Sequence, residues 1–192
     1  MSSLPDREKQ LLLGLARRVV TLAAERCESL EDLPQDENLI RPAGAFVTLR
    51  RRGRLRGCIG QLASNLPLIS VVAQSARAAA LEDPRFSPVR PNELAEIEIE
   101  LSVLSPMEDI EPRWIEAGKH GLMVSKDSQR GVLLPQVAKE FRWTAERLLE
   151  ETCVKAGLGR DAWKDPSTRI QAFAAEAFSE STLRIEPGAP GD

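Results

Sequence analysis

The chain has 192 residues, of which 42% are hydrophobic and 29% are charged. This composition allows a buried core and excludes a chain that is disordered throughout, and one compact domain or two lobes in close contact is the natural expectation. The formal net charge of −3 at pH 7 excludes a general electrostatic attraction to nucleic acid or to an anionic membrane.

Neither the start of the chain nor its cysteines indicate export. The first residues, MSSLPDREKQ, lack the apolar core of a signal peptide, and no apolar run approaches the length of a membrane span. The three cysteines are odd in number and far apart, so we expect a reducing, cytoplasmic environment. With one histidine and no C-x-x-C pair, the sequence predicts no metal site.

The first half of the sequence predicts two helices with a β-hairpin between them. Apolar residues at helical spacing predict a helix over 5–28. Two short apolar runs, 45–49 and 55–59, flank a turn at Gly53 and predict the hairpin. An alanine-rich helix over 67–82 follows, and its small side chains indicate close packing against a neighbouring element.

The second half predicts further strands and one clear helix. Strict alternation predicts a strand over 96–104, with Ile97, Ile99, Leu101 and Val103 facing inward. Two runs at 122–125 and 132–134 predict a second hairpin. Thr144 is expected to cap a helix that runs to Lys155, and Gly157 fits the left-handed position that ends it. The segment 168–178 fits a helix or a strand.

Because hairpins join several of these strands, the expected class is α+β, with a mixed sheet and packed helices. The whole chain, 1–192, is expected to form a single domain with its core at about 11–178. The last residues, 186–192, are rich in proline and glycine and are expected to be a disordered tail.

One short stretch, RLRGCIGQL, combines an apolar strand pattern with an arginine, a cysteine and two glycines. Side chains alternate between the two faces of a strand. The odd-numbered residues from Leu55 to Ile59 are therefore expected to face the core, with Arg56, Cys58 and Gly60 on the opposite face. A neighbouring cation favours the reactive thiolate form of a cysteine, so Arg56 could activate Cys58, and Gly60 could let a ligand reach the backbone.

The same stretch has a purely structural interpretation. A buried cysteine often behaves as a small apolar residue, and glycines in a strand often mark a bulge or tight packing. On the residues alone this interpretation is favoured over a reactive Cys58, because most lone cysteines are structural.

The hairpin also carries a cluster of positive charge that could hold a phosphate or an RNA backbone. A solvated hairpin tip explains it equally simply, and the acidic remainder of the chain favours that explanation. The cluster consists of Arg50, Arg51, Arg52, Arg54 and Arg56.

Two further groups could take part in acid–base chemistry or binding. Glu96, Glu98, Glu100 and Ser102 share one face of the strand over 96–104, as a solvated face or as part of a site, and Glu100 and Ser102 are the preferred site members. His120 lies between glycines and could be a general base or a capping residue.

Three charged residues have equally simple explanations. Asp83 and Arg85 lie in a proline-rich loop, where an ion pair within the loop would account for them. Lys155 lies at the end of a predicted helix, where a cation interacts favourably with the carbonyl groups.

An ordered set of motifs gives the sequence a specific resemblance. GAFVTL, LRGCIGQL, DPRF, EIELSVLSP, GKHGLMV, GVLLPQV and KAGL occur in this order along the chain. Together they resemble the AMMECR1 family, whose hallmark is the LRGCIG hexapeptide and whose prokaryotic members are called AmmeMemoRadiSam system protein A. The resemblance covers roughly residues 11–178.

The resemblance implies a fold of two intimately associated lobes, with the LRGCIG strand lining a cleft between them, and it implies that 168–178 is a strand. It implies a Memo-like protein and a radical SAM protein as partners. Arg56, Gly57, Cys58 and Gly60 match signature positions. The other shared blocks contain Asp83, Arg85, Glu100, Ser102, His120, Gln136 and Lys155.

Residues and resemblance together favour an enzyme, or an enzyme subunit, in a modification pathway. Cys58 would be the nucleophile or a covalent attachment point, and Arg56 would bind an anionic group. His120 or Glu100 would move protons, and Asp83 and Arg85 would shape the rim. The alternative is a non-catalytic adaptor for a small anionic ligand, a peptide or nucleic acid. No cofactor is indicated.

Overall fold

The structure is a computed structural model that describes residues 3–26, 39–62 and 64–183. The chain forms two compact units. The smaller unit is the segment Ser105–Ala175, and the larger unit comprises the described residues up to Leu104 and from Glu176 onward. The α+β class is confirmed, and the strand pairs given below are antiparallel where a mixed sheet was expected. The cleft between the lobes stays a prediction.

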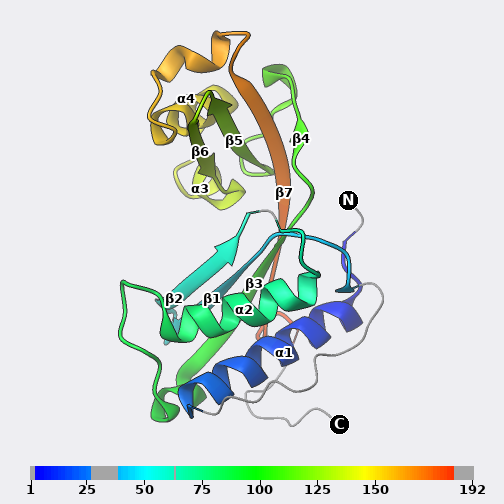
Figure 1. The fold of residues 1–192 in the computed structure, drawn as a ribbon, viewed down its shortest axis with the longest axis vertical. Coiled ribbons are helices and arrows are strands. Elements are labelled where there is room, and N and C mark those ends of the chain that lie inside the picture. The colour runs from blue at the N-terminus through cyan, green and yellow to red at the C-terminus, as the bar shows by residue number, and fades with distance from the viewer. Residues whose placement is uncertain (1–2, 27–38, 63, 184–192) are drawn as a thin grey trace. The chain divides into compact units, whose positions relative to one another are not determined.

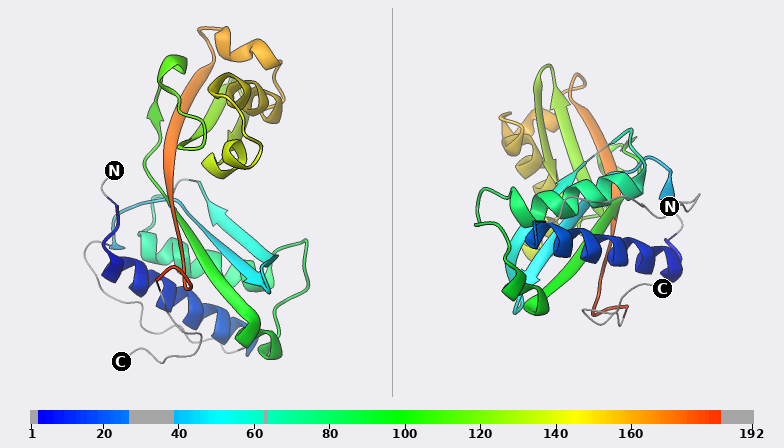
Figure 2. Two further views of the ribbon diagram at one scale, coloured as in Figure 1. Left: turned by 180° about the vertical axis from the view of Figure 1, so that it is seen from behind. Right: turned by 60° about the horizontal axis from the view of Figure 1, so that its bottom comes forward.

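The larger unit is a sheet with two helices on one of its faces (Figures 1 and 2). The strand order is β2-β1-β3-β7, so β2 is an edge strand. The elements are α1 (Asp6–Ala24), β1 (Ala45–Arg51), β2 (Arg54–Gln61), α2 (Leu68–Leu81), a 3-10 turn (Pro91–Glu96), β3 (Ile97–Leu104) and the end of β7 (Arg169–Ser179).

Alternation along β1 and β3 creates the core of this unit. Ala45, Val47 and Leu49 on β1 are fully buried, as are the odd-numbered residues of β3 from Ile97 to Val103. This apolar face packs against α2 and α1, whose own buried residues are also apolar and spaced at helical intervals. The predicted inward face of β3 is confirmed.

The predicted hairpin is confirmed, but a β-bulge changes its alternation. Leu49 lies opposite Gly57, whereas the next residue of β1, Arg50, lies opposite Leu55, so Arg56 is an extra residue in β2. Before the bulge, at Leu55, the side chain therefore lies on the opposite face of the sheet from the one that unbroken alternation predicts. Leu55 therefore lies on the face away from the core and is 39% exposed, and its predicted burial is wrong.

Gly57 and Gly60 are required by close packing. A Cβ atom on Gly57 would lie 2.2 Å from the carbonyl oxygen of Ala79 in α2. A Cβ atom on Gly60 would lie 2.3 Å from the carbonyl oxygen of Ala45. These glycines let β2 approach α2 and β1 more closely than any other residue allows.

The smaller unit has its own sheet and helices. Its elements are β4 (Glu108–Asp109), a 3-10 turn (Pro112–Trp114), β5 (His120–Lys126), β6 (Gln129–Leu133), α3 (Pro135–Glu140), α4 (Ala145–Lys155), a 3-10 turn called η4 (Arg160–Lys164) and the first part of β7. The strands β4 and β5 pair with β7, and β6 pairs with β5. The core includes Leu122, Val124, Leu148 and Cys153, all fully buried.

Both ends of α4 are as the sequence predicts. The Thr144 hydroxyl accepts a hydrogen bond from the Arg147 amide at 3.2 Å, which caps the first turn. Gly157 has a φ of +80°, and the Leu158 amide donates to the carbonyl of Cys153 at 2.9 Å, which ends the helix in a left-handed cap.

The segment 168–178 forms β7, so the strand implied by the family resemblance is confirmed. The helix predicted over 5–28 ends at Ala24, and residues 27–28 and the tail 186–192 lie outside the described residues. No helix in the described ranges combines the length and the apolar character needed to cross a membrane.

Two glycine substitutions test the packing of β2. Gly57→Ala forces a methyl group against the Ala79 carbonyl, so we expect it to lower the free energy of unfolding by about 2 kcal/mol or more. Gly14 is the control, since it lies in α1 with no atom within 4 Å of its Cβ position. Gly14→Ala should stabilise the fold by up to about 1 kcal/mol. Urea unfolding measures both, and a Gly57→Ala midpoint equal to that of the wild type would contradict the packing.

Candidate functional site

Cys58 lies on the edge strand β2, on the sheet face that α1 and α2 leave uncovered. It is directly opposite Thr48 of β1, and the Thr48 hydroxyl donates a hydrogen bond to the Cys58 sulfur at 3.3 Å. The cysteine is half-buried, whereas Cys153 is fully buried in the smaller unit. The sulfur of Cys58 is therefore in a polar, partly accessible environment.

The loop after α2 clamps the backbone of Cys58. The Asp83 carboxylate, 4% exposed, accepts a hydrogen bond from the Cys58 amide at 2.8 Å. Arg85 donates to the same carboxylate through Nε at 2.9 Å and Nη2 at 2.7 Å, and its Nη2 also donates to the Cys58 carbonyl at 3.2 Å. Both backbone groups that Cys58 presents at the sheet edge are thus occupied by one ion pair.

The clamp is strongly charged. Hydrogen bonds from Arg85 hold the pKa of the Asp83 carboxyl well below its usual range, against the opposing effect of burial. Hydrogen bonding to Asp83 raises the pKa of Arg85, and the Cys58 thiol adds to this effect. The cation beside Cys58 is therefore Arg85.

The bulge interrupts the alternation from which Arg56 was expected to share a face with Cys58, and the guanidinium of Arg56 pairs with a carboxylate, so its action on Cys58 and on an anionic group stays a prediction. Its Nε and Nη2 atoms each donate to Glu93 at 2.9 Å, and Glu93 is 7% exposed. Hydrogen bonding from Arg56 lowers the pKa of Glu93 to about 2. Arg56 therefore fixes the bulge to the 3-10 turn before β3.

Phe86, in the same loop as the clamp, links the two arginines. Its ring centroid lies 6.0 Å from Cζ of Arg56 and 5.6 Å from Cζ of Arg85. These are cation–π distances. Phe86, Thr48 and Glu93 were not singled out in the sequence; only an exact hairpin register would have placed Thr48 opposite Cys58.

Glu100 and Ser102 lie on the same face of the sheet as Cys58. Thr48 is opposite both Cys58 and Glu100, so the three residues form a row across β2, β1 and β3. Two strand spacings of about 4.8 Å separate the backbones of Cys58 and Glu100 by about 10 Å. Glu100 accepts a hydrogen bond from Arg50 at 3.2 Å. Ser102 is buried, in the next row of the same face.

Most of the predicted arginine cluster is neutralised by carboxylates. Arg50 pairs with Glu100, Arg51 with Glu93 and Glu96, Arg52 with Glu96, and Arg56 with Glu93. These pairs reduce the positive charge available to a phosphate. Binding of nucleic acid or of an anionic ligand stays a prediction.

His120, Gln136 and Lys155 belong to the smaller unit, where they lie on β5, α3 and α4. The Nδ1 atom of His120 accepts a hydrogen bond from the Glu116 amide at 3.1 Å, which matches the capping role considered from the sequence. Gln136 and Lys155 are exposed. Their catalytic or binding roles stay predictions, as do those of Gly57 and Gly60 beyond packing.

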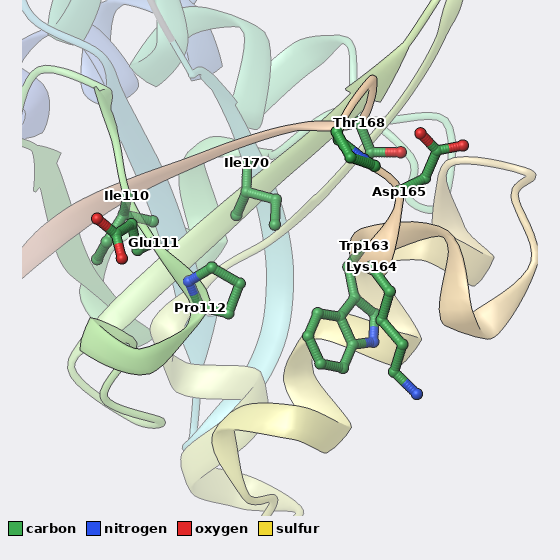
Figure 3. Close-up of a pocket in the computed structure, with 9 residues that line it drawn as sticks. Ile110, Glu111, Pro112, Trp163, Lys164, Asp165, Thr168 and Ile170 are labelled. Carbon is green, nitrogen blue, oxygen red and sulfur yellow. The ribbon is translucent and has the colours of Figure 1, made fainter.

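The smaller unit also has an open pocket of about 510 Å³ on its surface (Figure 3). Ile110 and Pro112 line it from the segment after β4, and Trp163 lines it from η4. Thr168 also lines it and is 8% exposed. Neither the Thr168 hydroxyl nor the indole nitrogen of Trp163 has a hydrogen-bond partner among the described residues. Within residues 3–26, 39–62 and 64–183, no three His, Cys, Asp or Glu side chains gather as a metal ion requires.

The Arg56–Glu93 ion pair predicts a specific pH dependence. Because the pKa of Glu93 is lower in the folded chain than its ordinary value of 4.5, its contribution to stability is complete above about pH 5 and is lost as the pH falls toward 2. A decrease to about 2 corresponds to about 3 kcal/mol. Glu93→Gln should therefore destabilise the fold at pH 7 and weaken its acid sensitivity.

Urea unfolding between pH 2 and pH 7 measures this dependence. Glu82→Gln is the control, since Glu82 is an exposed carboxylate paired with Arg77, and we expect it to change the stability at pH 7 by less than about 0.5 kcal/mol. A Glu93→Gln variant as stable as Glu82→Gln at pH 7 would contradict a stabilising role for the pair.

Comparisons with known proteins agree with the motifs. The family model described as AMMECR1 matches residues 13–178. A protein of Thermococcus gammatolerans is 42% identical over 96% of both chains, and one of Methanothermobacter thermautotrophicus is 43% identical over 90% of this chain and 94% of its own. The crystal structure of the uncharacterized protein PH0010 from Pyrococcus horikoshii has a TM-score of 0.82 and 39% identity, and covers 94% of this chain and 95% of that one.

These relatives share the fold and most of the length of the chain, and none carries a name that states an activity. The chain belongs to the AMMECR1 family.

Proposed function

We propose that this chain is an enzyme or an enzyme subunit in which Cys58 is the nucleophile or a covalent attachment point. The observation that supports this most directly is the Asp83–Arg85 clamp. Its hydrogen bonds meet at the backbone of Cys58, and Arg85 places a positive charge beside the thiol.

The Asp83–Arg85 clamp has a cost in free energy that a purely structural role does not explain. Burying the Asp83 carboxylate requires desolvation, which an ion pair only partly offsets. A structural cysteine needs no such partner, as Cys153 illustrates: burial raises the pKa of its thiol, and no cation is among the causes of that shift. Fixed backbone geometry and an adjacent cation are what a nucleophilic cysteine requires.

The surrounding side chains define how a reaction could run on this face. The sulfur would form a bond to an electrophilic carbon of the substrate, that carbon would release its leaving group, and the thiol proton would pass to a base or to solvent. Arg85 would bind an anionic group of the substrate. Glu100 lies two strands away from Cys58 and pairs with Arg50, so its role would be to bind the substrate or to protonate the leaving group.

The wider pathway is proposed from the family resemblance. A Memo-like protein and a radical SAM protein would act with this chain in a modification pathway. His120, in the smaller unit, is the second candidate for proton transfer, with its Nε2 atom available while Nδ1 accepts from the backbone.

Alkylation by iodoacetamide tests whether Cys58 is set up as a nucleophile. In a Cys27→Ser background we expect native protein to be labelled at Cys58 and not at Cys153, which is 0% exposed. Arg85→Gln should lower the rate constant for Cys58 about tenfold, because the adjacent positive charge is removed. Mass spectrometry of the peptides that contain each cysteine measures both rates.

Arg77→Gln is a matched control for this experiment. The side chain of Arg77 is 55% exposed and pairs with Glu82 at 2.7 Å, and that of Arg85 is 54% exposed and pairs with Asp83 at 2.7 Å. Only Arg85 contacts Cys58. If both variants are labelled at the wild-type rate, or if native Cys58 is inert, the thiol mechanism is wrong.

A further inference from the structure

We propose that the groove between β2 and α2 binds an extended, uncharged peptide segment, which pairs with the free edge of β2 at Gly60. This inference concerns the opposite side of β2 from the Cys58 side chain, and it does not depend on the thiol chemistry.

The backbone groups at the free edge of β2 have hydrogen-bond partners at Cys58 and are open at Gly60. The Cys58 amide and carbonyl point away from β1 and are occupied by Asp83 and Arg85. Backbone direction repeats every second residue, and the register is regular from Gly57 to Gln61, so the amide and carbonyl of Gly60 point the same way. Among the described residues, no group outside the sheet forms a hydrogen bond with the amide or the carbonyl of Gly60.

A groove of about 340 Å³ lies beside this open position. Ile59 and Gln61 line it from β2, on either side of Gly60, and Ser75 and Ala78 line it from α2. Ser75 is 2% exposed, and its hydroxyl has no hydrogen-bond partner among the described residues. A buried hydroxyl of this kind costs free energy unless a ligand or water satisfies it.

The chemistry of the groove indicates the occupant. The free amide and carbonyl of Gly60 can form two hydrogen bonds with the carbonyl and amide of one residue of an added strand. Addition of an extended peptide to the open edge of a sheet is a known mode of peptide recognition. The charged residues of the groove, Arg77 and Glu82, pair with each other at 2.7 Å, so the groove favours neither an anion nor a cation. The Ser75 hydroxyl favours a neutral side chain that forms hydrogen bonds, such as glutamine or asparagine.

The clamp limits how far the peptide extends. An antiparallel strand that pairs with Gly60 would next meet the Cys58 position, where Asp83 and Arg85 already occupy the edge. The peptide would therefore pair at Gly60, direct one side chain toward Ser75, and turn away at Asp83.

Binding of a defined peptide tests the proposal. The probe is acetyl-Thr-Val-Gln-Val-Thr-amide, titrated into 15N-labelled full-length protein, and the control probe carries methyl groups on both valine nitrogens, which removes the donors to the Gly60 carbonyl. We expect saturable shifts of the Ile59, Gly60 and Gln61 amides, and at least tenfold weaker binding of the methylated peptide.

Variants locate the binding. Ala78→Phe fills the groove and should abolish binding, and Ser75→Ala should weaken it about fivefold. Gln10→Phe adds the same ring at an exposed position of α1 and should bind like the wild type. Equal binding of the two peptides, shifts confined to other residues, or no binding at millimolar peptide would overturn the proposal. A dimer of the wild type in sedimentation that Ala78→Phe converts to a monomer would also overturn it, because a second copy of the chain would then be the occupant.

Discussion

The buried carboxylate of Asp83 is the constraint on which the local structure around Cys58 depends. A negative charge that is almost fully removed from water needs a cation and several donors. Arg85 supplies the cation from two residues away, and the Cys58 amide supplies a donor from the edge of β2. The loop after α2 is thereby fixed to the signature strand, and the edge of that strand is closed at Cys58.

A second constraint, the bulge at Arg56, decides what the signature strand presents on each side. Arg56, the extra residue of the bulge, pairs with Glu93, and Cys58 lies in a row with Thr48 and Glu100. The face with the thiol then carries polar groups at strand spacing, and the groove lies along the other side of β2, against α2. One strand of eight residues therefore contributes to both proposed sites, the thiol face and the peptide groove.

Periodicity was sufficient to predict most of the fold. The alternation of β3, the hairpin around Gly53 and the caps of α4 follow from local sequence, and the structure confirms them. Periodicity could not reveal the bulge, since alternation assumes an unbroken register, and this is why Leu55 was misplaced. The clamp was equally hidden, because Asp83 lies 25 residues from Cys58 and an ion pair within its own loop explained it as well. The family resemblance decided the ambiguous strand β7, which local pattern left open.

Amide hydrogen exchange of β2 tests the role of Asp83 most directly. Cys58 and Gly60 lie on the same strand edge. Without the clamp, their amides would therefore exchange at similar rates after correction for their intrinsic exchange rates. With the clamp, the Cys58 amide should be protected at least about 100-fold more than that of Gly60, and Asp83→Ala should remove the difference. Equal protection of the two amides in the wild type would contradict a clamp at Cys58.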